Sequence, residues 1–123
     1  MFDHVKFGVR DYAASKTFYL QALEPLGVTI AGGDDPSYGI EICGSHNASL
    51  CLYQTEGQPA PLHIAFVATT RAQVDAFHKA ALAAGGKDNG PPGLRPKYHA
   101  NYYAAFVIDP DGHNIEAVCH APG

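Results

Sequence analysis

The chain contains an internal repeat, and this repeat limits the possible folds more than any other feature of the sequence. The segment DYAASKTFYLQALEPLG, from Asp11 to Gly27, aligns with TRAQVDAFHKAALAAGG, from Thr70 to Gly86. The same offset of 59 residues relates His4 to His63. Self-similarity at a fixed spacing indicates that one supersecondary unit occurs twice. We therefore expect a single domain over residues 1–123, with one module at about 1–56 and a second at about 61–121.

Each copy has the pattern of one strand, one helix and three further strands. The helices follow the N-cap residues Asp11 and Thr70 and end near glycines, at Gly27 and at the Gly85–Gly86 pair. The turn sequence DPDG, residues 109–112, predicts a hairpin before the last strand. The expected strands are 2–9, 28–31, 38–43 and 48–54 in the first copy, and 62–68, a weak strand near Lys87, 102–108 and 113–120 in the second. The predicted fold is α+β, a βαβββ module repeated in tandem.

One segment of the second copy has no counterpart in the first. Residues 89–96 (NGPPGLRP) are rich in Pro and Gly, so the sequence predicts a loop insertion there and not a strand. Loops on a rigid scaffold often carry binding residues. The candidates for substrate contact in and after this loop are Arg95, Tyr98, His99, Asn101 and Tyr103. A solvated loop held by its prolines explains the segment equally well.

Composition and charge exclude several classes of protein. The sequence is 46% hydrophobic and 16% charged, which is typical of a globular domain. With a net charge of −4 and 8 scattered Lys and Arg residues, it has no basic patch for nucleic acid. No apolar run is long enough to span a membrane, and the start lacks the features of a signal peptide, so we expect a cytoplasmic protein. The cysteines lie in apolar runs, which favours reduced thiols: Cys43, Cys51 and Cys119.

Alternation along three strands places three metal-binding residue types on one face. The apolar rows at positions 5, 7 and 9, at 62, 64 and 66, and at 115, 117 and 119 are expected under the helices. This leaves His4, His63 and Glu116 on the opposite face. Two imidazoles and one carboxylate bind Zn, Ni, Mn or Fe(II) and leave positions open for water or substrate. Each residue alone has a simpler explanation, as a chain-end histidine, a core hydrogen bond or a solvated charge, but their coincidence favours a divalent metal site.

The sequence resembles the vicinal oxygen chelate superfamily, which includes glyoxalase I, extradiol dioxygenases, fosfomycin- and bleomycin-resistance proteins and methylmalonyl-CoA epimerase. The resemblance covers nearly the whole chain and rests on HVKFGVRDYAASKTFYLQALEPLG, HIAFVATTRAQVDAFHKAALAAGG and AAFVIDPDGHNIEAV, with DPDGHNIE the most specific part. It implies a mixed sheet curled around a metal-containing cavity, helices on the outer face, and ligands at His4, His63 and Glu116. It also implies a homodimer, because two modules in this superfamily commonly complete their cavity with another copy.

The resemblance leaves one ligand position unmatched. Four-ligand members such as glyoxalase I carry a further acid on the last strand of the first module, where this chain has Cys51. A free cysteine is more commonly a small buried hydrophobe than a thiolate ligand or a near-site residue, and this departure counts against glyoxalase activity. Glu41 and Tyr53 alternate onto the same face, where they either serve a substrate pocket, Glu41 as a general base, or are solvated and packing residues.

Three classes of function remain open. The leading prediction is a metal-dependent lyase, isomerase or dioxygenase whose small-molecule substrate chelates the ion through adjacent oxygens, with Glu116 as ligand and proton acceptor. The second is a binding or resistance protein that holds a small molecule in the same cavity without turnover. The third is an interaction protein with a vestigial site, because fold alone does not decide function. The set of three ligands favours the first class.

Overall fold

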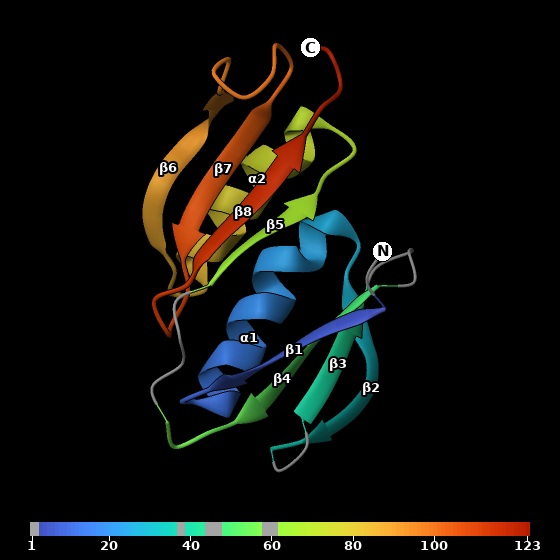
Figure 1. The fold of residues 1–123 in the computed structure, drawn as a ribbon, viewed down its shortest axis with the longest axis vertical. Coiled ribbons are helices and arrows are strands. Elements are labelled where there is room, and N and C mark those ends of the chain that lie inside the picture. Colours follow the sequence, from blue (N-terminus) through green and yellow to red (C-terminus); the bar gives the residue numbers. More distant parts are fainter. Residues whose placement is uncertain (1–2, 37–38, 44–47, 58–61) are drawn as a thin grey trace.

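The structure, a computed structural model, describes residues 3–36, 39–43, 48–57 and 62–123, and in these it has the predicted order of elements (Figure 1). The starts predicted for two strands, at Phe2 and Tyr38, lie outside the described residues. The elements of the first module are β1 (His4–Val9), α1 (Tyr12–Leu23), a short 3₁₀ helix (Glu24–Leu26), β2 (Thr29–Asp35), β3 (Gly39–Cys43) and β4 (Ser49–Gln54). Those of the second are β5 (His63–Val67), α2 (Arg71–Ala83), β6 (Lys87–Leu94), β7 (Tyr103–Ile108) and β8 (Asn114–Cys119).

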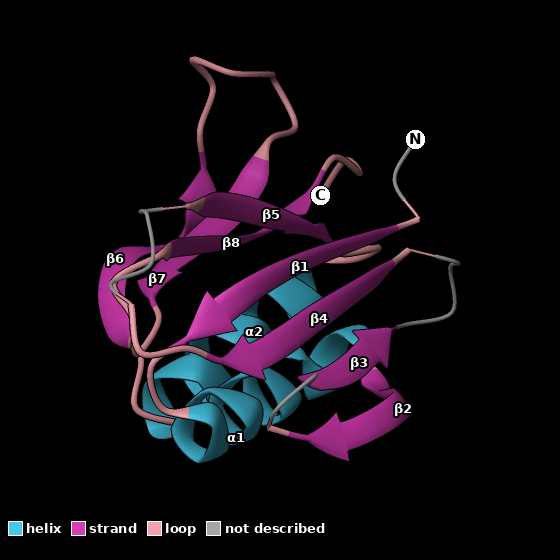
Figure 2. Cartoon of the chain, turned by 60° about the horizontal axis from the view of Figure 1, so that its bottom comes forward, coloured by secondary structure: helices cyan, strands magenta, loops and turns pink. Residues whose placement is uncertain are grey.

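Each module forms its own four-stranded sheet, and the two sheets have the same topology. The strand orders are β1-β4-β3-β2 and β5-β8-β7-β6. The first strand of each module pairs in parallel with the last, and the other pairs are antiparallel. Both helices lie on the same side of the sheets, which leaves the opposite faces uncovered by helix (Figure 2). The predicted α+β fold of two tandem βαβββ modules is confirmed.

The helices begin and end where the sequence predicts. Asp11 caps α1 by accepting a hydrogen bond from the backbone N–H of Ala14, and Thr70 forms a capping box with Gln73 at the start of α2. Gly27 follows the 3₁₀ helix with a φ of 81°, a left-handed conformation that glycine adopts without steric cost. No described helix has the length and apolar character needed to cross a membrane.

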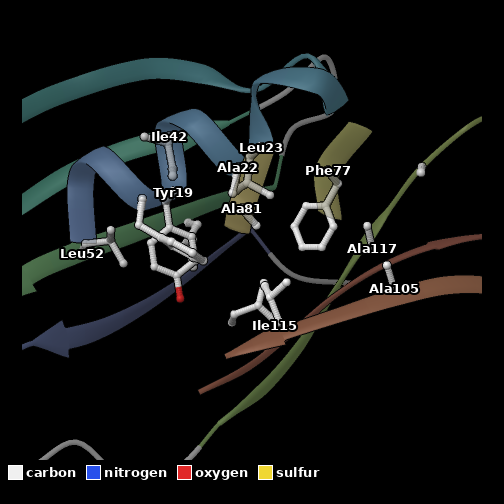
Figure 3. Close-up of a cluster of buried hydrophobic side chains, with 14 of the residues drawn as sticks. Tyr19, Ala22, Leu23, Ile42, Leu52, Phe77, Ala81, Ala105, Ile115 and Ala117 are labelled. Atoms are coloured by element: carbon white, nitrogen blue, oxygen red, sulfur yellow. The ribbon is translucent and has the colours of Figure 1, made fainter. Parts of the chain in front are cut away.

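A single hydrophobic core joins the two modules. Helices α1 and α2 pack against each other, and Ala22 and Ala81, which are related by the repeat offset, are both fully buried near this contact (Figure 3). Phe77 and Ile115 lie beside them and are also fully buried. Because small side chains let two helices approach closely, the contact between α1 and α2 is a main part of the interface between the modules.

The predicted loop at residues 89–96 is wrong, because most of it belongs to strand β6. Strand β6 pairs antiparallel with β7 at the edge of the second sheet. The pairing shifts between Gly90 and Gly93, so Pro91 and Pro92 fall where no ladder hydrogen bond is needed. An edge strand with a bulge is one of the few places where a sheet accepts proline. The sequence rule that excluded a strand applies to central strands.

Candidate metal centre

Two of the three predicted ligands meet on the helix-free face of the second sheet. Glu116 of β8 lies next to β5, where it pairs with Ala65, two residues after His63. The Nε2 atom of His63 lies 2.9 Å from Oε1 of Glu116. The carboxylate is 2% exposed, whereas the imidazole is half exposed. A buried acid beside an accessible histidine leaves the pair open to a ligand from one side.

The backbone holds the His63 ring in the orientation that a metal ligand needs. Its Nδ1 atom lies 3.0 Å from the carbonyl oxygen of Asn114, which can only accept a hydrogen bond, so Nδ1 carries a proton. The atom available for coordination is therefore Nε2, the one that faces Glu116. A carbonyl that fixes the tautomer of a histidine in this way is a common support of metal sites.

Tyr102, which the sequence analysis did not single out, completes the surroundings of the carboxylate. Its hydroxyl donates a short hydrogen bond to Oε2 of Glu116. Burial and the neighbouring Glu116 raise the pKa of Tyr102 to about 12, so the hydroxyl keeps its proton and remains a donor. Glu116 is thus held from both sides, with one oxygen toward His63 and the other under Tyr102.

The third predicted ligand, His4, lies on the other sheet. It starts β1, where its side chain is about half exposed and its Nδ1 atom lies 2.6 Å from the carboxylate of Asp3. Among the described residues, no group of three or more His, Cys, Asp or Glu side chains is placed to hold a metal ion. The described part of one chain therefore brings together His63 and Glu116 but not His4. The pair combines an imidazole and a carboxylate, which are two donor types of divalent-metal sites.

The predicted side chains of the first module do share a face. Glu41 and Cys51 are direct cross-strand neighbours, and together with Lys6 they line a hollow on the first sheet. Burial raises the pKa of the Cys51 thiol, which favours the protonated form over a thiolate. Tyr53 lies beside this group, with the Lys6 ammonium 5.3 Å from its ring centre.

The candidates near β6 divide between the two sides of the second sheet. Arg95 and Tyr98 line a hollow on the face that carries His63. Tyr103 lies on the opposite side, where its hydroxyl donates to Asp75 of α2 at 2.6 Å. The remaining two candidates lie in the connection before β7, where the backbone N–H of Asn101 donates a hydrogen bond to Nδ1 of His99. The structure therefore does not bring Tyr103 to the His63–Glu116 pair.

Comparisons with known proteins agree on one family. Residues 1–117 match the model of the Glyoxalase/Bleomycin resistance protein/Dioxygenase superfamily. A glyoxalase/bleomycin resistance protein from Albidiferax ferrireducens is 34% identical, with a TM-score of 0.80 and coverage of 99% of both chains. A family enzyme from Burkholderia phytofirmans (18% identity, TM-score 0.75, coverage 97% and 98%) and Oxidase ChaP-H2 (21%, 0.70, coverage 100% and 95%) have the same fold. No curated protein sequence matches the chain.

Proposed function

The chain belongs to the Glyoxalase/Bleomycin resistance protein/Dioxygenase superfamily, and on that basis we propose that it is a metal-dependent enzyme acting on a small molecule that chelates a divalent ion through adjacent oxygens. The reaction class is lyase, isomerase or dioxygenase. The observation that carries the proposal is the contact between His63 Nε2 and the buried carboxylate of Glu116. An imidazole and a carboxylate are two of the donor types that divalent metal sites use, and here they meet on a face that the half-exposed imidazole leaves accessible.

A second copy of the chain would supply the third ligand. His4 is on β1 and His63 is on β5, and each of these strands ends its sheet. The helix-free face of one sheet carries His4, and that of the other carries His63 and Glu116. A homodimer in which the first module of one chain faces the second module of the other would bring the three together twice, by symmetry.

The positions of Glu116, Tyr102 and His63 suggest a separate role for each residue at such a site. Glu116 presents Oε1 on the side of His63, while Oε2 stays under the Tyr102 hydroxyl and can accept a proton. The half-exposed His63 leaves the approach to the pair open to a substrate. A divalent ion (Zn, Ni, Mn or Fe(II)) would act there as a Lewis acid toward the substrate's oxygens.

Metal analysis tests this proposal. Protein stripped with EDTA and then incubated separately with Zn, Ni, Mn and Fe(II) is desalted, and its metal content is measured by mass spectrometry. We expect on the order of one tightly held ion per chain in the wild type and a large loss in His63→Ala and Glu116→Gln, because each removes a ligand. Circular dichroism verifies that both variants are folded.

His78→Ala provides a matched control. His78 also pairs with a carboxylate, that of Asp88 at 3.0 Å, but it lies on helix α2. Its loss should leave the metal content unchanged. Wild-type protein that holds no ion under any of the four conditions would contradict the proposal and favour a binding or interaction protein.

A further inference from the structure

A group of polar side chains lies beside the His63–Glu116 pair without contributing to it. The group surrounds a hollow of about 280 Å³ on the same sheet, which Gly90 and the Phe106 ring also line, and its polar members are Asn89, Arg95, Lys97, Tyr98 and Asn114. A hollow of this size accommodates a small molecule or one end of it. The proposed metal chemistry uses none of these side chains, so they need a separate explanation.

The guanidinium of Arg95 lies against the backbone of β6. Its Nη2 atom donates to the carbonyl oxygen of Pro91 at 2.7 Å. A Cβ atom added at Gly90 would lie 3.2 Å from Nη2, and one added at Gly93 would lie 3.1 Å from Nη1, both closer than ordinary contacts. Both glycines therefore lie against the guanidinium, and Gly90 also lies against Phe106, whose ring would be 3.0 Å from a Cβ atom there. The guanidinium is thus packed and hydrogen-bonded against β6 and does not extend freely into solvent.

The hollow is positively charged in a chain whose net charge is −4. Two of its lining side chains are cations, Arg95 and Lys97, and none is acidic. Within the described residues, neither cation forms an ion pair with a carboxylate. The amides of Asn89 and Asn114 are joined by a 3.2 Å hydrogen bond and add polar groups to the same wall. Arginine has five N–H donors in a planar fork that matches carboxylate and phosphate.

Phe106 connects this hollow to the proposed metal pair. Its ring stacks with that of His63, with ring centres 6.2 Å apart and planes at 23°. The Arg95 guanidinium lies over the same Phe106 ring, 5.4 Å from its centre. The cationic group and the proposed metal pair therefore contact the same aromatic ring.

We propose that the hollow around Arg95 and Lys97 binds an oxyanion, a carboxylate or phosphate, at the end of the substrate opposite to the oxygens that reach His63 and Glu116. This inference rests on the proposed function, since it assigns the substrate class of that site: a small molecule with a second, anionic group. The Gly- and Pro-rich segment of β6 is then the element that holds the anion-binding guanidinium in place.

Binding of simple anions to the metal-free protein tests the proposal. The full chain, labelled with ¹⁵N and treated with EDTA, is titrated with benzoate, with phenyl phosphate and with the neutral analogue benzamide, and side-chain N–H signals are followed by NMR. We expect saturable shifts of the signals of Arg95, Asn89 and Asn114 with benzoate or phenyl phosphate, with a Kd on the order of millimolar, and none with benzamide. The ratio of the two Kd values distinguishes a carboxylate site from a phosphate site.

Charge variants locate the binding. Arg95→Gln should raise the Kd of the tighter anion about tenfold, because it removes a charge-assisted pair of hydrogen bonds. Lys79→Gln removes one positive charge from the exposed side of α2 and should leave the Kd unchanged. If Arg95→Gln does not fold, Lys97→Gln is the alternative test. Lys97 is exposed, and its loss should still raise the Kd of the anion by a few-fold.

Two results would overturn the inference: benzamide binding as well as benzoate, or the Arg95 and Lys97 variants binding anions as the Lys79 variant does. Because the titration is done without metal, its outcome is independent of the metal analysis. Protein that binds benzoate at Arg95 but never holds an ion would contradict the proposed function alone. Protein that holds an ion but shows no anion binding would contradict this inference alone.

Discussion

At the scale of single residues, the hydroxyl of Tyr102 is the group that controls the geometry of Glu116. A buried carboxylate with one partner on each oxygen cannot rotate, so its second oxygen stays away from the imidazole. Groups that hold a metal ligand in this way commonly affect affinity almost as much as the ligands themselves. Tyr102 is therefore a positioning residue of the proposed centre.

Tyr102→Phe should lower the affinity for the divalent ion by about 10- to 100-fold without unfolding the protein. The variant removes only the hydroxyl, so Glu116 remains but is free to turn. Competition with a chromogenic chelator measures the affinity, and a thermal melt of the metal-free protein measures stability. An unchanged affinity would remove Tyr102 from the site.

Tyr98→Phe is the matched control for this change. The Tyr98 ring packs against Tyr102, with ring centres 5.0 Å apart, but it is 59% exposed, and among the described contacts its hydroxyl is not bonded to Glu116. Its loss should leave metal affinity as it is. A similar drop in both variants would indicate a general effect of this aromatic cluster and not the loss of one hydrogen bond.

Sequence alternation identified the faces of individual strands but not the neighbours of every side chain. It placed His63 and Glu116 on one face because both strands carry an uninterrupted apolar row. It did not separate Tyr102 from Tyr103, since a shift of one residue at the start of a strand moves a side chain to the other face. The structure places Tyr103 in one row with the buried positions 105 and 107. In the sequence the row at 104, 106 and 108 is equally apolar, so alternation alone gave no signal that assigned Tyr102 to the side of Glu116.

At the scale of elements, the turn before β8 is a point where the second module is bonded to α1 of the first. Asp109 is 4% exposed and accepts a short hydrogen bond from the hydroxyl of the fully buried Tyr19. Ser15 and the backbone of Arg10 donate to Asp111 in the same turn. Burial raises the pKa of Tyr19 well above its usual value, so its hydroxyl stays a donor. The DPDG turn thus connects strands β7 and β8 and, through these hydrogen bonds, also links the second module to the first.

Tyr19→Phe should lower the free energy of unfolding by about 1–3 kcal/mol, because it leaves a buried carboxylate without one of its donors. Urea denaturation at neutral pH measures the loss. Tyr12→Phe is the control on the same helix, since its hydroxyl also bonds to a carboxylate, that of Asp34, but this carboxylate is 46% exposed. Water can replace that bond, so the control should lose less. Equal losses would contradict a special role for the buried contact.

Strand β6 illustrates why the boundary of an element is harder to predict than its existence. Local rules excluded a strand at Pro91 and Pro92, and these rules describe isolated sequence. The strand forms because β7 offers a pairing edge and because a bulge removes the need for the missing N–H groups. The pairing edge is supplied by residues outside the segment, so the composition of the segment by itself does not reveal the strand.

At the scale of the whole molecule, the central question is how the two modules meet. Their helices form one core within a chain, and the faces with His4 and with the His63–Glu116 pair lie on separate sheets. The repeat predicts equivalent positions for His4 and His63 but carries no information on the placement of one sheet relative to the other. Alternation therefore predicts which face of its own sheet each ligand lies on. Whether His4 meets His63 and Glu116 depends on contacts between sheets or between chains, which alternation does not encode.

Mixing two inactive variants decides whether the proposed centre is shared between chains. In a shared arrangement, His4→Ala and His63→Ala each lose both sites of their own dimer, but a mixed dimer contains one site in which all ligands are intact. Refolding an equal mixture should then restore about a quarter of the wild-type metal content, since about half of the dimers are mixed and each has one of two sites. Mixing His63→Ala with Glu116→Ala should restore none, because both residues come from the same module. No recovery in the first mixture, or a monomer in light scattering at micromolar concentration, would instead place any complete site within one chain.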